Sequence, residues 1–273
     1  MSKEKIVKLQ AREALKGNIS VLIAAMGSIA LTAVALLELF YLLIVALGTV
    51  DIETDEIRPG AELLYFGSYA LCSLLAVGAT PMINGFMRMA GDVAVKGKCE
   101  IGKLFYYYKS PLRFFKSVVI DMGLLLIFSA LTFPADAVAK LLADYGELVG
   151  IAVAVAGVIW KILVFLFFIH YPLAIFALDD SRGIFRYLFC CTGFSFRHSG
   201  ALIGLLFSML GWIALCFFVV PALYVIPYLE VALMNSARWL LSSSHTKGTD
   251  EAVNARFSGR GPSYSYRSHF SDI

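Results

Sequence analysis

Residues 19–50 read ISVLIAAMGSIALTAVALLELFYLLIVALGTV, and this stretch decides the class of fold. Glu38 is its only charged residue. A helix of about 20 apolar residues crosses the hydrocarbon core of a bilayer, which is roughly 30 Å thick. The stretch is long enough for such a helix, and it is about twice the length of the apolar region of a signal peptide. It therefore predicts a transmembrane helix that remains in the protein.

The composition of the whole chain agrees with a membrane protein. Of its 273 residues, 59% are hydrophobic and 16% are charged, and the mean hydropathy is +0.78. Soluble domains have roughly 45–50% apolar and about 25% charged residues. This composition excludes a cytosolic enzyme and a nucleic-acid-binding module, and the net charge of +3 is too small to argue for an anionic polymer as partner.

Further apolar segments follow the first one along the chain. The last, residues 201–241, is too long for one span and fits two, with a turn near residues 220–222 where prolines favour a break. We therefore expect an all-α, polytopic membrane helix bundle with six transmembrane helices and interfacial amphipathic helices. The expected spans are 19–50, 61–86, 118–139, 148–178, 201–220 and 222–241.

The two ends of the chain are more polar. Residues 2–17 predict a short helix at the headgroup level, with Ser2 as N-cap and Gly17 as its stop, so that residues 1–18 form a cytoplasmic N-terminal helix. Residues 242–273 are rich in Ser and Gly and have no hydrophobic periodicity, which predicts a disordered cytoplasmic tail.

The distribution of Lys and Arg predicts the orientation. Basic residues concentrate before the first span, in residues 88–116, in residues 179–199 and from Arg238 onward. Six spans with a cytoplasmic N-terminus place twenty of the 23 Lys and Arg residues inside, as the positive-inside rule requires. We therefore expect a multi-pass protein of the cell inner (plasma) membrane with both termini in the cytoplasm.

Two cytoplasmic connections mix aromatic with basic residues: CEIGKLFYYYKSPLRFFKS (99–117) and DDSRGIFRYLFCCTGFSFRHS (179–199). One interpretation is an amphipathic helix lying among lipid headgroups; residues 99–116 would form it, with Phe105, Tyr108, Phe114 or Phe115 inserted among lipids. The other is a docking surface for a lipid headgroup or a cytoplasmic protein. The candidate lipid or partner residues are Lys103, Phe105, Tyr106, Tyr108, Lys109, Arg113, Arg182 and Arg186.

Charges inside the spans form a second group of candidates, because each costs roughly 2.5–3.5 kcal/mol at mid-helix on insertion scales. Glu38 and Lys161 have opposite charge and similar depth, which predicts a direct pair that serves helix packing or forms a substrate or proton site. Unpaired, snorkelling side chains are the remaining alternative. The intramembrane candidates are Glu38, Lys161, Glu230 as a second partner, Asp121, and His170, which we expect to be a hydrogen-bonded packing residue.

No catalytic motif is present in the sequence. It contains no nucleophile elbow, phosphate loop, HExxH or acid-pair motif, and its five cysteines are not at metal-binding spacing. We therefore expect a protein that is not an enzyme and that uses no metal and no cofactor.

Several segments together resemble a family of bacterial integral membrane proteins catalogued as domain of unknown function 975. They are AREALKGN (11–18), PMING (81–85) with Arg88, LFYYY (104–108), AIFALDD (174–180), LGWI (210–213) and IPYL (226–229). The resemblance covers residues 9–240. It departs where Asp180 and Ser181 replace the usual Asn/Asp-Pro, and in the polar tail. It implies fold and location only, because the family has no established activity.

Two functional hypotheses follow. The first is a non-enzymatic membrane protein that acts through its cytoplasmic basic and aromatic face on the lipid bilayer, on anionic lipids, or on a membrane or cytoplasmic protein partner. The second is a transporter of a small solute or ion that uses the intramembrane charges. A polar, water-reaching cavity around those charges would favour transport, and a sealed apolar bundle would favour the first hypothesis.

Overall fold

The regular structure of the chain is helical, in a computed structural model that describes residues 3–51, 54, 56–142, 147–181, 183–190, 199–215 and 219–245. The exception within these residues is one isolated β-bridge between Val50 and Ile57. The all-α class is confirmed. The helical elements are α1 (Lys3–Leu15), α2 (Ile19–Ala46), α3 (Glu62–Ala79), α4 (Pro81–Lys96), η1 (Ile101–Lys103), η2 (Tyr106–Lys109), α5 (Pro111–Leu142), α6 (Glu147–Val164), η4 (Phe165–His170), α7 (Tyr171–Leu178), η5 (Arg186–Cys190), α9 (Ser199–Leu215) and α10 (Val219–His245).

Four helical stretches in the described residues are long and apolar enough to cross a membrane. They carry large exposed apolar side chains: Leu31, Leu63 and Phe133 are 70%, 85% and 71% exposed. Such surfaces are unfavourable in water and are what a bilayer covers. The first four expected spans are therefore confirmed as candidate membrane helices. The stretches are Ile19–Ala46, Glu62–Lys96, Pro111–Leu142 and Val149–Leu178.

The second of these stretches consists of two helices, α3 and α4, that meet at Pro81. Proline lacks the N–H that would continue the helical hydrogen bonds, and its ring crowds the preceding turn. Helical structure does not end at residue 86, as we expected, but resumes at Pro81 and continues to Lys96. The reason is burial: α4 is amphipathic, and its side chains Phe86, Met89 and Val93 belong to the core.

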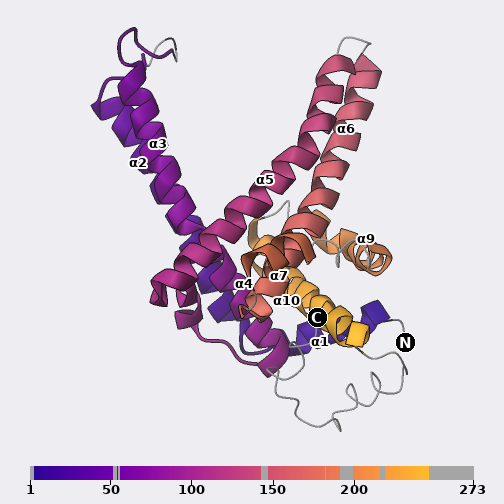
Figure 1. Ribbon diagram of the computed structural model, residues 1–273. Coiled ribbons are helices and arrows are strands. Elements are labelled where there is room, and N and C mark those ends of the chain that lie inside the picture. Colours follow the sequence, from indigo (N-terminus) through magenta and orange to yellow (C-terminus); the bar gives the residue numbers. More distant parts are fainter. Residues whose placement is uncertain are drawn as a thin grey trace. The chain divides into compact units, whose positions relative to one another are not determined.

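The chain divides into two compact units, Met1–Ala237 and Arg238–Ile273. In the first unit α2 lies beside α3, and α5 lies beside α6 (Figure 1). Helix α4 packs mainly on α7 and also contacts α1, α2 and α5. The buried core therefore forms around α4, whereas the two helix pairs present mostly apolar surface.

The last apolar stretch contains helices α9 and α10, with bounds that differ from the expected ones. Helix α9 ends at Leu215 and α10 begins at Val219, so residues 220–222 are helical and the predicted turn there is wrong. Pro221 occupies the first turn of α10, where a missing N–H removes no helical hydrogen bond. Helix α10 also extends to His245, into the expected tail, and the rest of that tail lies outside the described residues.

One side chain joins the beginning of the first candidate span to the end of the second. The Asn18 amide donates to the backbone oxygens of Ala14, at 2.9 Å, and of Gly97, at 2.8 Å. Its Oδ1 accepts the backbone N–H of Cys99 at 3.2 Å. Gly17 and Gly97 both have left-handed backbone, with φ of 84° and 69°, which ends α1 and α4 next to this link. The N-terminal segment and the segment after α4 therefore lie at the same end of the helices.

Candidate lipid-binding site

The segment of residues 99–117 is not the interfacial helix that we expected. It contains two short 3₁₀ turns, η1 and η2, and α5 begins at Pro111. Ser110 has extended backbone, with φ −148° and ψ 133°, because the residue before a proline is disfavoured in helical geometry. The segment folds back onto the helices and buries Tyr107 completely.

Tyr107 anchors this segment in the core. Its ring stacks on Phe176 of α7 with a centroid distance of 5.1 Å, and Tyr187 meets Phe176 edge-on at 5.0 Å. The Tyr107 hydroxyl is buried beside the Arg88 side chain. Burial raises the pKa of Tyr107, although the charge of Arg88 opposes this. The hydroxyl therefore stays protonated at neutral pH and can donate a hydrogen bond.

Tyr106 holds two guanidinium groups against its ring. The Cζ atoms of Arg88 and Arg113 lie 3.8 Å and 4.5 Å from the ring centroid, and Lys103 Nζ lies 5.9 Å from it. The Tyr106 hydroxyl donates to Asp180 Oδ2 at 3.0 Å. Cation–π contacts are worth about 0.5–1 kcal/mol each at exposed positions, so Tyr106 gathers positive charge at one place.

Asp180 links the segment after α4 to the segment after α7. Its carboxylate lies 3.5 Å from Arg88 Nη1, and its backbone oxygen accepts a hydrogen bond of 2.5 Å from Lys116 Nζ. The Tyr187 hydroxyl donates to the neighbouring backbone oxygen of Asp179 at 2.5 Å. Asp180 thus attaches the turn after α7 to α4 through Arg88, to α5 through Lys116 and to η2 through Tyr106.

A pocket of about 300 Å³ opens beside these residues. Its lining contains two cations, Arg113 and Lys116, and a single carboxylate, Asp180, which Arg88 and Tyr106 already contact. Arg113 forms no ion pair within the described residues. The pocket can therefore take a negatively charged group. The pocket, together with Tyr106 and Arg88, which contact Asp180 in its lining, is called the Tyr106 site. The full lining is Tyr107, Leu112, Arg113, Lys116, Phe176, Asp180 and Ser181.

Comparison with known proteins adds no relative: no family model, no curated protein and no solved structure matches this chain.

The intramembrane charges are not arranged as we expected. Lys161 Nζ lies 2.7 Å from Asp136 Oδ1 of α5, whereas Glu38 is exposed on α2. The predicted Glu38–Lys161 contact is wrong. Equal depth does not bring two residues together unless their helices are neighbours, and α6, which carries Lys161, packs against α5.

The other intramembrane candidates lie beside polar groups. His170 Nε2 is 3.7 Å from Glu230 Oε2, too long for a hydrogen bond; the His170 side chain is buried, and that of Glu230 is 12% exposed. Asp121 Oδ1 accepts a hydrogen bond of 2.7 Å from the Asn84 amide, which also donates to Ser117. Glu230 therefore lies beside His170 rather than beside Lys161.

The remaining interfacial candidates lie around the Tyr106 site or outside the described residues. Phe105 and Tyr108 are exposed, and the Tyr108 hydroxyl donates to Gly78 O at 2.8 Å. Lys109 is exposed at the end of η2, and Arg186 begins the π-helical segment η5. Arg182 lies outside the described residues.

Sequence reasoning missed several residues that build the Tyr106 site. The sequence presents Lys116 only as a loop charge, Arg88 as a loop charge and as part of the family resemblance, and Asp180 only within that resemblance. Arg88 and Asp180 are far apart in sequence, and only the packing of α4 on α7 brings them together. The closest signal in the sequence is the set of segments that carry the resemblance, since three of them meet here.

Proposed function

We propose that the chain is a non-enzymatic integral membrane protein that binds the headgroup of an anionic lipid at the Tyr106 site. The observation that carries this proposal is the pocket lined by Arg113 and Lys116 against the Tyr107 and Phe176 rings. Phosphate oxygens accept charge-assisted hydrogen bonds from guanidinium and ammonium groups. Basic and aromatic side chains together are what the headgroup region favours.

We also propose six spans in the inner membrane, with both termini in the cytoplasm. The hydrogen bonds of Asn18 to the segment after α4, and of Lys116 to Asp180, support this topology, because they join three basic segments at one end of the helices. Reporter fusions that are active only outside the membrane should be silent after Leu241. External activity there would require an odd number of spans.

Membership of the family catalogued as domain of unknown function 975 remains our proposal as well. Three segments that carry the resemblance pack against one another. Gly85 meets the backbone of Leu104, Tyr107 stacks on Phe176, and Arg88 pairs with Asp180. These contacts support the proposal, because segments that pack against one another in a fold restrict which side chains each of them can carry.

The contacts of the intramembrane charges favour lipid binding over transport. Lys161 pairs with Asp136, and Glu230 lies beside His170. None of these residues is among the described residues that line the Tyr106 site. A transporter that used them would need a polar cavity reaching them.

The test is the lipid that copurifies with the protein. Arg113→Gln removes one cation from the pocket lining, and Lys109→Gln removes an exposed cation that does not line it. Quantitative mass spectrometry of purified protein should show less phosphatidylglycerol bound to Arg113→Gln and an unchanged amount bound to Lys109→Gln. Equal loss in both variants would mean general surface attraction. Unchanged lipid together with loss of an acidic copurifying protein would favour a protein partner.

A further inference from the structure

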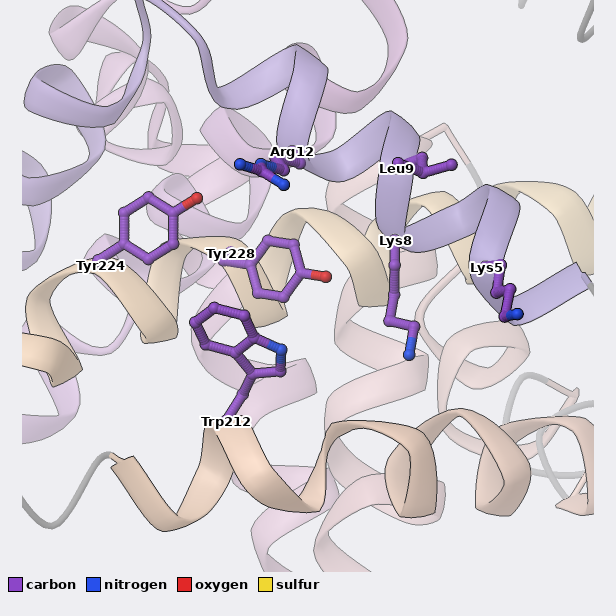
Figure 2. A pocket seen from close by; sticks show the side chains of 7 residues that line it. All are labelled: Lys5, Lys8, Leu9, Arg12, Trp212, Tyr224 and Tyr228. Carbon is purple, nitrogen blue, oxygen red and sulfur yellow. The ribbon is translucent and has the colours of Figure 1, made fainter.

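A second pocket, of about 610 Å³, lies between α1, α9 and α10. Figure 2 shows the side chains of Lys5 and Lys8 extending from α1 toward α9, and the aromatic rings of α9 and α10 beside one another. Among the side chains that the structure describes, the lining of this pocket contains no acidic residue. The lining residues are Lys5, Lys8, Leu9, Arg12, Trp212, Tyr224 and Tyr228.

The cations of this pocket come from one face of α1. Lys5, Lys8 and Arg12 are spaced three and four residues apart, which places them on the same side of a helix. Lys8 Nζ donates to the backbone oxygen of Ser208 on α9 at 3.2 Å, so its partner is uncharged. Three positive charges thus face a pocket whose described lining contains no carboxylate to neutralise them.

Aromatic rings form the opposite wall. The Trp212 and Tyr228 ring centroids lie 5.5 Å apart, and the Tyr224 and Tyr228 rings are nearly parallel at 6.3 Å. Trp212 and Tyr224 are 40% and 39% exposed. Half-exposed Trp and Tyr rings are typical of the boundary between headgroups and acyl chains, where one part of a side chain meets hydrocarbon and another meets water.

We propose that this pocket binds an anionic phospholipid, with the phosphate at Lys5, Lys8 and Arg12 and the upper acyl chain against Trp212 and Leu9. The cations supply the charge complementarity, and the rings and Leu9, which is 48% exposed, supply an apolar path. Free phosphate would use only the first of these features. The bound lipid would hold α1 against α9 and α10.

This inference rests on the membrane location proposed above but shares no residue with the Tyr106 site. The reporter for it is Trp212, in the full-length protein with Trp160 and Trp239 replaced by Phe. Brominated lipids quench tryptophan fluorescence on contact. Vesicles that contain brominated phosphatidylglycerol should quench Trp212 more strongly than vesicles with the same fraction of brominated phosphatidylcholine.

Substitutions test whether the preference for phosphatidylglycerol over phosphatidylcholine comes from this pocket. Lys8→Gln with Arg12→Gln should abolish the difference between the two lipids. Lys16→Gln with Lys98→Gln removes the same charge from exposed positions outside the pocket and should preserve the difference. Arg113→Gln should also preserve it, so that failure of the Tyr106 site and failure of this pocket give different results.

Three outcomes would overturn the proposal. Equal quenching by both lipids in the unsubstituted reporter protein would do so without depending on how any pocket variant folds. An unchanged preference in the Lys8/Arg12 variant would place the lipid elsewhere. Relief of quenching by soluble inorganic phosphate at matched ionic strength would show that the pocket recognises a free phosphate rather than a phospholipid.

Discussion

Gly85 of α4 lies directly against the backbone of Leu104: a Cβ atom built on Gly85 would be 1.9 Å from the Leu104 carbonyl oxygen. No real pair of atoms tolerates that distance, and a backbone oxygen cannot move aside as a side chain can. The segment that carries Tyr106 and Tyr107 can therefore approach α4 only because residue 85 has no side chain.

Gly85→Ala should displace this segment and lower the stability of the protein in detergent. Overpacking a closely packed site costs about 1–3 kcal/mol, and thermal unfolding followed by circular dichroism would measure it. Gly67→Ala on α3 is the matched control, because nothing lies within 4 Å of the added methyl group and alanine favours helix. A Gly85→Ala protein as stable as the control would show that residues 101–109 do not pack on α4.

Substitutions of Tyr106 should separate its hydroxyl from its ring. Tyr106→Phe removes the hydrogen bond to Asp180 and should cost about 0.5–1.5 kcal/mol. Tyr106→Ala also removes the cation–π contacts with Arg88 and Arg113 and should cost more. Unfolding measurements would compare both with Tyr41→Phe, which alters a 56% exposed ring on α2. Equal losses for Phe and Ala would mean that the ring contributes nothing.

A double-mutant cycle should detect coupling between Lys161 and Asp136. Both side chains are about half exposed, at 43% and 50%, but they lie on candidate membrane helices, where lipid or detergent covers apolar surface. The coupling free energy should therefore exceed the about 0.2–1 kcal/mol of an ion pair exposed to water. Lys161→Met and Asp136→Asn supply the cycle, and melting temperatures supply the measurement. The same cycle with Glu38→Gln in place of Asp136→Asn should give additive losses. Coupling of Lys161 to Glu38 instead would contradict the helix pairing described here.

Cys99 should react slowly with a neutral alkylating reagent at neutral pH. Burial, with a smaller effect from nearby Asp92, raises the pKa of the Cys99 thiol to about 11, and the thiolate is the reactive species. In a variant whose other cysteines are alanine, the rate of reaction with iodoacetamide should keep rising as the pH rises from 8 to about 11. The same protein unfolded in dodecyl sulfate should reach its plateau earlier, near the ordinary thiol pKa of about 8.5. Identical pH profiles would mean that Cys99 is not buried.

The helices themselves could be predicted from the sequence, because each apolar run contains its own evidence. The first four runs needed only length and hydropathy, as Ile19–Ala46 illustrates. The predicted end of the second span is wrong because a helix can continue beyond its apolar run when one of its faces is buried. Helix α4 continues to Lys96 for this reason. Pro111 begins α5 and keeps Ser110 out of helical geometry, so residues 99–116 do not form one interfacial helix; this signal is present in the sequence.

The contacts of the site could not be predicted in the same way. The depth of a residue in the membrane follows from counting residues along its helix. Its contact partner depends on which helices pack together, and Lys161 pairs with Asp136 because α6 packs on α5. The Arg88–Asp180 pair likewise depends on α4 packing against α7. The clustering of basic and aromatic residues predicts which part of the chain carries the candidate site, but it does not predict the local structure of that part.

The Asn18 side chain has a consequence for the order of synthesis. It binds Gly97 and Cys99, so both ends of the link are synthesised before α5. Chains fold from their N-terminal end as they are synthesised. Helices α1 to α4 can thus close in the membrane as a first assembly step, and α7 then arrives at a face of α4 that is already in position.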